Sequence, residues 1–507
     1  MSGVLVFIVF IIGSLAMIRR WLPALLTLPL MAVAMVAVAA LASGEISWND
    51  LLTGVIKDGS QRLNEAILTA FFGGMISFVM QKSGAAESLV KNGAELVGDN
   101  PFAVAVFSMG LIALLFTTIG GLGALMMVCL VVVPMLATAG VPSAVIGGII
   151  LIGLSMGGTM NPTAWAATKD SLGVSMEQIQ GFSVIVFLLM AMTGLTFIAV
   201  ELYRARQLKQ PLKTAMILLG LLLASGIAAG LIGRGLHRAA LAESGVVAQA
   251  SAAVASANEP RSLWIRIPAG VLLGGIMLIM LSHHFKKMKR WRHQVAEIRW
   301  YAYLIPLVPL VLIFAFKMET IPAFICGFIY AIVATLRPGS VSLTVQSMIQ
   351  GSASTLPAVL LMVGIGILIT AVQGPKGWAE ANGGHTWPVI AGIKPYFAML
   401  PNTRLGYVVI FTVCAPLALY RGPLNTWGLG FGMATLLISG AGYPAAAVMG
   451  MLMTVGQIQG VCDPTNTANV WLANELRVDV MSLMWRTIPY IWVMGIMGLI
   501  ISAFVFM

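Results

Sequence analysis

Charged residues are scarce in this chain of 507 residues. Asp, Glu, Lys and Arg make up 9% of it, whereas 59% of the residues are hydrophobic. Soluble domains carry about 25% charged residues. A soluble core of this length could not bury so much apolar surface, so the composition argues against a soluble protein and predicts that lipid is the main solvent. The expected fold class is an all-α polytopic membrane protein.

Cysteine is also scarce, and its four positions lie in apolar segments without paired spacing: Cys129, Cys326, Cys414 and Cys462. That pattern disfavours a disulfide framework or a metal site and predicts thiols in the core. The sequence also lacks a Walker A loop, a zinc motif and a nucleophile elbow. We therefore expect no enzyme activity, no bound metal and no organic cofactor.

Ten apolar runs are long enough to cross a bilayer. The first lacks the basic start and the small-residue cleavage site of a signal peptide, so we interpret it as a span. The runs lie at 3–18, 22–42, 64–81, 180–202, 213–233, 264–282, 301–316, 320–336, 355–373 and 484–506. Two further regions, 102–176 and 404–478, are apolar but interrupted by Gly and Pro.

The net charge of +11 comes from short basic loops between these runs, which disfavours nucleic acid as a partner. The basic clusters include 19–20, 204–213 and 283–299, with Arg337 and Arg477 further on. All of them can face the cytoplasm only if the N-terminus is outside. The sequence thus predicts a multi-pass protein of the inner membrane, surrounded by the lipid bilayer, with both termini in the periplasm.

A weak internal repeat joins the two interrupted regions. Residues 140–176 align with residues 442–478 at a constant offset of 302, and both copies contain a Gly-(x)₃-Pro-Thr break. The aligned pairs are Gly140 and Gly442, Pro142 and Pro444, Gly158 and Gly460, Asn161 and Asp463, Pro162 and Pro464, and Thr163 and Thr465. Each copy is expected to be a broken transmembrane helix, near 143–175 and near 443–478.

Upstream of each broken helix lies a pair of short apolar limbs joined by a Gly-containing tip. We interpret these pairs, near 102–139 and near 404–439, as re-entrant hairpins, because irregular backbone at membrane depth is tolerated only inside protein or beside a water-filled cavity. With the first hairpin entering from inside and the second from outside, the basic loops stay cytoplasmic. The two copies are then inverted repeats, with about twelve crossings in total.

The repeat divides the chain into three parts. Residues 1–233 form the first inverted repeat and residues 301–507 the second. Between them, residues 234–300 hold a periplasmic linker, a linking span and the basic cytoplasmic loop.

This segment order, with its broken helices, resembles the ion transporter superfamily. Within it, the citrate–proton/metal symporters and the gluconate and anaerobic dicarboxylate carriers look closest. The resemblance implies a scaffold domain, a mobile transport domain with elevator-type alternating access, a homodimer, and coupling to sodium or protons. It also implies polar hairpin tips, rich in Ser or Asp. The first tip here departs from that pattern, since it reads IGGLG after Thr117 and Thr118.

Helix breaks in the membrane expose backbone groups, with partial positive charge at a helix N-terminus and partial negative charge at a C-terminus. Such breaks can hold a carboxylate at one end and a cation at the other, although Gly and Pro can also kink helices for packing alone. We expect substrate contacts from Thr118, Gly120, Gly121, Asn161, Thr163, Arg421, Gly422, Asn425, Thr465, Asn466 and Thr467. We expect ion coupling at Asp463, Asn161, Gly158 and Gly460.

Three ionisable residues stand out in these segments. Asp463 is interpreted as a proton-carrying or cation-binding carboxylate, because an unpaired charge at membrane depth is costly; the alternative is a structural acid that is paired or neutral. Lys169 and Asp170 either pair with neighbouring residues or face an outer cavity.

Arg421 lies at the second hairpin tip, where its guanidinium could bind a carboxylate with two parallel hydrogen bonds. The alternatives are an arginine that reaches toward the outer surface and one that pairs with Asp463.

These features predict a secondary active transporter of small organic anions, coupled to protons or sodium. A cation–proton antiporter is the first alternative, with Asp463 and Asp170 as exchanging carboxylates and Arg421 in a structural role. The second alternative is a non-transporting membrane scaffold that binds partners through the linker, although a scaffold has no need of matched helix breaks.

Overall fold

The computed structural model describes residues 2–19, 21–97, 100–208, 210–243, 272–280, 282, 298–336 and 340–507. Every regular element in these ranges is a helix. Eight helices there are long and apolar enough to cross a membrane, or up to nine if the bent pair forms one span, and five further apolar helices have 10–17 residues. The predicted all-α polytopic class is confirmed, with eight or nine spans by length where about twelve crossings were expected. The basic loop 283–297 and linker residues 244–262 lie outside the described residues, as do residues 264–271 and 281 of the expected span at 264–282.

Each half of the chain begins with the same order of elements: two helices, then a long run that includes a π-helical turn, then short helices. The first half contains α1 (Ser2–Ile18), α2 (Ala24–Ser43), η1 (Asp50–Asp58), α3 (Gly59–Gln61), α4 (Asn64–Ser83) and α5 (Ala85–Val97). The second contains η2 (Trp300–Leu304), α13 (Val308–Phe316), α14 (Thr320–Ala334), α15 (Ser340–Gln346), η3 (Ser347–Gly351), α16 (Ser352–Gln373), α17 (Trp378–Ala381) and α18 (Pro388–Phe397). The run expected at 64–81 therefore starts earlier, since the polar residues of η1 interrupt its hydropathy but not its helix.

Pairs of short helices occupy the two stretches that were interpreted as hairpins, and re-entrance stays a prediction. The first consists of α6 (Pro101–Phe116) and α7 (Leu122–Thr138). The second is more irregular and consists of α19 (Arg404–Cys414), the 3₁₀ segment η4 (Ala415–Arg421), the π segment η5 (Thr426–Gly430) and α20 (Phe431–Ser439). Each hairpin is followed by a two-part helix and then by a long one.

The two-part helices are α8 (Ser143–Thr159) with α9 (Pro162–Leu172), and α21 (Ala445–Cys462) with α22 (Thr467–Glu475). The first is bent by 55° at its break, whereas the second continues as one candidate span over Ala445–Glu475. The long helices that follow are α10 (Met176–Arg204) and α23 (Val480–Phe506), and α11 (Pro211–Glu243) comes after α10.

The breaks are shorter than expected on the N-terminal side. Gly157 and Gly158 lie inside α8, and Gly460 lies inside α21. Gly157 is a packing residue: a Cβ there would collide with the carbonyl oxygen of Ala113 on α6. Gly158 and Gly460, which were expected in the breaks, therefore lie in regular helix just before them.

Contacts between the halves follow the repeat. The Ser155 hydroxyl donates to the Gln457 side-chain oxygen at 2.7 Å, and these residues are counterparts at the offset of 302. A residue can contact its own counterpart only near a pseudo-two-fold axis that relates the two copies. On the long runs, a Cβ at Gly351 would lie 2.7 Å from the Gly74 carbonyl oxygen, and one at Gly59 would lie 2.9 Å from the Ile367 Cα. The inverted orientation in the membrane stays a prediction.

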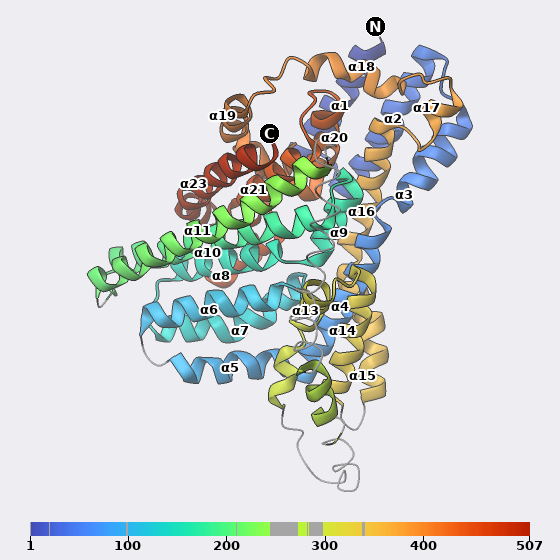
Figure 1. Cartoon of the computed structure of the whole chain (residues 1–507). Helices are drawn as coiled ribbons and strands as arrows, with labels where there is room; N and C mark the ends of the chain where they lie inside the picture. Colours follow the sequence, from blue (N-terminus) through green and yellow to red (C-terminus); the bar gives the residue numbers. More distant parts are fainter. Residues whose placement is uncertain are drawn as a thin grey trace.

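Figure 1 shows two groups of helices. The leading-helix group (residues 2–83 and 308–373) contains the upright column of α4, α14, α15 and α16, and the hairpin group (residues 101–204 and 404–506) contains α6 to α10, which lie across that column. The two groups meet where α9 packs against α4 and where α20 packs against α16.

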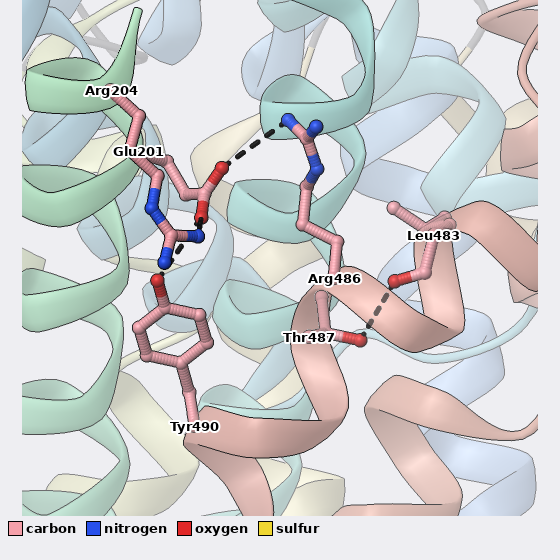
Figure 2. A network of polar contacts seen from close by, with 6 residues as sticks. All are labelled: Glu201, Arg204, Leu483, Arg486, Thr487 and Tyr490. Carbon is pink, nitrogen blue, oxygen red and sulfur yellow. Dashed lines mark hydrogen bonds and ion pairs between the residues drawn. The ribbon is translucent and has the colours of Figure 1, made fainter.

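A charged network joins α10 to α23 inside the hairpin group (Figure 2). Glu201 is 3% exposed and contacts Arg204 at 2.9 Å and Arg486 at 3.3 Å. The Tyr490 hydroxyl donates to the same carboxylate at 3.0 Å. A buried carboxylate is costly unless it is paired. These three donors compensate the charge of Glu201 and allow it to connect α10 to α23.

Candidate functional site

A cavity of about 640 Å³ lies between both hairpin tips, both helix breaks and a wall formed by α2, α4 and α16. It collects most of the residues predicted for binding: Thr118, Gly120, Gly121, Gly158, Asn161, Thr163, Arg421, Asn425, Asp463, Asn466 and Thr467. Gly422 and Thr465 are not among its lining residues, and Gly460 lines a neighbouring cavity with Gln457. The structure thus places residues from opposite ends of the sequence around one space.

The first tip presents a bare helix N-terminus to this space. Gly121 precedes α7 with φ +89 and ψ 164, a conformation that favours glycine, and it provides no side-chain cap. In the part of the chain that the structure describes, the N–H groups of Leu122, Gly123 and Ala124 find no protein acceptor. The buried hydroxyl of Thr118 also lacks a partner there. The glycine-rich tip thereby leaves donors free for a ligand.

Two further helices begin beside this tip. A second cavity of about 310 Å³ is lined by Gly121 and Leu122 at the start of α7, Asn161 at the start of α9, and Asn466 and Thr467 at the start of α22. Each helix N-terminus carries a partial positive charge of roughly half an elementary charge. Their convergence favours an anion at the tips.

The second tip is strained and carries the arginine. Tyr420 and Arg421 both have positive φ, at 55° and 57°. Consecutive left-handed residues other than glycine cost about 1–3 kcal/mol each. Arg421 lines the cavity, is exposed, and forms no ion pair or hydrogen bond with another described side chain. The strained backbone therefore positions an unpaired guanidinium at the cavity that Gly120 and Gly121 of the first tip also line.

The Asp463 carboxylate, at the second helix break, hydrogen-bonds to this strained tip. Its Oδ1 accepts the backbone N–H of Tyr420 at 3.1 Å, the backbone N–H of Thr465 at 2.8 Å and the Thr465 hydroxyl at 2.8 Å. Asp463 is 1% exposed. It does not form an ion pair with Arg421 in the described structure, so the pairing considered as an alternative is not found; the neighbouring N–H of Tyr420 takes that place.

Asn161 performs the matching task in the first half. Its side-chain oxygen accepts the N–H of Thr163 at 2.9 Å, as Asp463 does with Thr465. Its amide donates to the carbonyl oxygen of Phe116, at the end of α6, at 3.5 Å. Each break therefore hydrogen-bonds to its own hairpin. Asn161 donates to a carbonyl of the first hairpin, whereas Asp463 accepts an N–H of the second.

Asn425 has a structural part in the second tip. It is 2% exposed, and its amide donates to the Ala418 carbonyl at 3.3 Å across the tip. Its own backbone carbonyl accepts the N–H of Gly430 at 2.7 Å. Substrate contact by Asn425 stays a prediction, and its role in closing the tip is what the structure supports.

The cavity wall was not predicted from the sequence. Ser354, Thr355 and Met362 on α16 line it together with Gly73 and Gly74 on α4. The sequence GSAST at 351–355 is a polar interruption that could have indicated this wall. In hydropathy this polar stretch resembles the boundary of a span. In the structure it lies within the helical run, where the hydroxyls of Ser354 and Thr355 donate to the carbonyls of Gly351 and Ser352.

Comparison with known proteins gives similar solved structures but no similar sequence. No protein family and no curated protein matches the sequence. One similar solved structure is described as the Alcanivorax borkumensis YdaH transporter, with an unusual topology; it shares 13% identity with a TM-score of 0.45, over 95% of this chain and 97% of the other. At that similarity, the function has to be argued from the residues of this chain.

Lys169 and Asp170 lie apart from the cavity, where α9 packs against α4. The Lys169 ammonium pairs with the Glu65 carboxylate at 2.8 Å. Asp170 faces the first turn of α4, near Arg62. The expectation that these two residues pair with neighbours is met for Lys169. Among the described residues, no group of three or more His, Cys, Asp or Glu side chains is arranged to hold a metal ion.

Proposed function

We propose that this chain is a secondary active transporter of small organic anions, chiefly carboxylates, coupled to protons or sodium. The observation that supports it best is that one cavity is lined both by Arg421, whose guanidinium is unpaired, and by Gly121 at the bare N-terminus of α7. A substrate carboxylate offers acceptors to both, so it would compensate donors that have no partner in the protein.

The remaining parts of the proposal come from the resemblance in segment order. They are membership of the citrate, gluconate and dicarboxylate carrier branch of the ion transporter superfamily, elevator-type movement of the hairpin group past the leading-helix group, a homodimer, and location in the inner membrane. Asp463, Asn161, Gly158 and Gly460 stay candidates for ion coupling. The division between the two helix groups supports such a movement, because the groups pack against each other mainly where α9 meets α4 and where α20 meets α16.

A cation–proton antiporter is the competing proposal. It is favoured by the carboxylate of Asp170, which has a buried oxygen without a hydrogen-bond partner in the described structure. It is disfavoured at the cavity itself, where the fixed positive charge of Arg421 would repel a cation unless Asp463 neutralised it. Robust sodium–proton exchange in vesicles without any organic anion would favour the antiporter.

The experiment is a binding screen followed by substitution of Arg421. Purified protein is screened by thermal shift against citrate, succinate and gluconate, with sodium, lithium or neither. Arg421→Ala should weaken binding of the best ligand by about 10–100-fold, because a hydrogen bond to a charged group is worth about 1.5–3 kcal/mol. Arg421→Lys should weaken it less, since it keeps the charge and loses the planar fork.

Arg404 supplies the matched control. It is the first residue of α19, whereas Arg421 is the last residue of the following segment η4. Arg404 is exposed and does not line the cavity. Arg404→Ala should bind the ligand as the wild type does. Normal binding by both Arg421 variants would contradict anion recognition at the second tip.

A further inference from the structure

Four charged residues form a crossed arrangement between the two helix groups, outside the cavity. On α9, Lys169 and Asp170 are adjacent; on the opposite run, Arg62 and Glu65 are three residues apart. Lys169 pairs with Glu65 at 2.8 Å, and Asp170 interacts electrostatically with Arg62. The four formal charges cancel when all are ionised.

Asp170 is the incompletely satisfied member. The backbone N–H groups of Glu65 and Ala66, in the first turn of α4, face its carboxylate, so an ionised Asp170 acts on the positive end of that helix. Its Oδ2 is buried and has no hydrogen-bond partner in the described structure. The Nε of Arg62 is also buried without a partner, while its guanidinium donates to the side-chain oxygen of Gln373 on α16.

Other charges near this arrangement are few. Glu319, which precedes α14, adds a negative charge that Lys169 senses. The remaining elements that pack against α9 are α16, α20, α21 and α10. The helices α16, α20 and α21 contain no charged residue, and the charged residues of α10 lie at its two ends. The protonation state of Asp170 therefore decides the local charge balance.

We propose that Asp170 carries the coupling proton, and that its protonation releases α9 from α4. One proton from water adds to the free Oδ2 and changes the side-chain charge from −1 to 0, while no existing hydrogen bond at that oxygen has to break. Arg62 and the N-terminus of α4 then lose their counter-charge, so the contact between the two helix groups weakens. This inference rests on the proposed transport function.

The hydrogen bonds of Asp463 argue against this residue as the proton carrier. Its Oδ1 accepts three hydrogen bonds that hold the strained tip, so adding a proton there weakens the binding site itself. Asp170 lies away from the ligand cavity and at the boundary between the two groups. Protonation at Asp170 can therefore control movement without disrupting recognition.

The first test measures the contact without any substrate. In a protein without native cysteines, Glu65→Cys and Lys169→Cys place two thiols where the side chains now meet. The reaction of the thiols with maleimide depends on pH by itself, so each rate is compared with that of the same double-cysteine protein carrying Asp170→Asn at the same pH. Cross-linking by a short bismaleimide should be about fivefold faster in the protein that keeps Asp170 than in the one with Asp170→Asn near pH 8, because ionised Asp170 holds α9 against α4, and equal in the two proteins near pH 5. A ratio of the two rates that is the same at both pH values would overturn the proposal.

The second test measures coupling in proteoliposomes with labelled succinate as the probe. The ratio of proton-driven accumulation to succinate exchange should fall about tenfold in Asp170→Asn, since exchange needs no net proton movement. Asp170→Glu should restore the ratio in part. The matched control is Asp58→Asn, an exposed carboxylate on the same helical run as Arg62. An Asp170→Asn protein that accumulates succinate normally would refute proton carriage by Asp170.

These two tests separate failure of the inference from failure of the proposed function. If the wild type neither binds nor exchanges citrate, succinate or gluconate, the proposed substrate class is wrong. The cross-linking rates still decide whether Asp170 controls the contact of α9 with α4. If the carboxylates are exchanged but the ratio of cross-linking rates with and without Asp170 does not change with pH, the transporter proposal stands and the coupling proposal falls.

Discussion

Replacement of Asp463 by asparagine tests how the second tip is held in place. In the wild type, one carboxylate oxygen accepts three hydrogen bonds, from Tyr420 and Thr465. Hydrogen bonds to charged groups contribute about 1.5–3 kcal/mol, and those between neutral groups about 0.5–1.5 kcal/mol. Asp463→Asn keeps an oxygen acceptor and loses the charge, so the three bonds together lose about 3 kcal/mol.

This loss is comparable with the strain that the tip stores. Two left-handed residues at about 1–3 kcal/mol each give a total of about 2–6 kcal/mol at Tyr420 and Arg421. Once the bonds weaken, the tip can relax to ordinary backbone angles and move the Arg421 guanidinium away from the cavity. We expect affinity for the best carboxylate to fall by about 10–100-fold, with the protein still folded in the membrane. Concentrative uptake should fall strongly as well.

The assay compares ligand affinity, exchange and accumulation in one set of proteoliposomes. If Asp463 anchors the tip, affinity, exchange and accumulation all fall together. If it carries the coupling ion, accumulation is lost while affinity and exchange persist. Thr465→Val is the graded control, because it removes one of the three bonds and keeps the charge, and it should cost about 1 kcal/mol. Wild-type affinity and accumulation in Asp463→Asn would refute both roles.

Two further predictions concern the first tip and the topology. Gly121→Ala should destabilise the protein by about 1–3 kcal/mol in a thermal unfolding assay, because its φ is +89. Gly120→Ala, with nothing within 4 Å of an added Cβ, should leave stability unchanged and obstruct ligand binding; equal stability of the two variants would contradict this. For topology, a cysteine at position 2 should react with an impermeant reagent in intact cells, whereas one at position 290, outside the described residues, should not. The opposite labelling pattern would reject periplasmic termini.

The alignment of the two copies predicted the most informative pair of residues. Asn161 and Asp463 were matched from spacing alone, and the structure gives them the same turn: each accepts the N–H two residues further on. Their different side chains follow from what each hairpin offers, a carbonyl of Phe116 or an N–H of Tyr420. That choice could not be predicted, since it depends on contacts far away along the chain.

Other features had no local signal in the sequence. The left-handed conformation of Tyr420 and Arg421 occurs at residue types that rarely adopt it, so no turn motif announced the strain. The pair formed by Lys169 and Glu65 joins residues 104 positions apart. The hydropathy pattern predicted the long apolar helices, such as those at 22–42, 180–202 and 484–506, because burial in lipid acts on each segment locally, whereas tertiary contacts determine the tips.

The glycine contacts between the two long runs determine which parts of this protein are able to move. At Gly59, Gly74, Gly351 and Gly366 the backbones of the two runs touch with no side chain between them. Side chains can change rotamer as helices slide, whereas backbone against backbone has no such freedom, and any shift either collides or opens a gap. The runs that contain α4 and α16 are therefore held rigidly against each other at these four glycines. In the proposed elevator-type movement, the hairpin tips would travel along this rigid pair of runs.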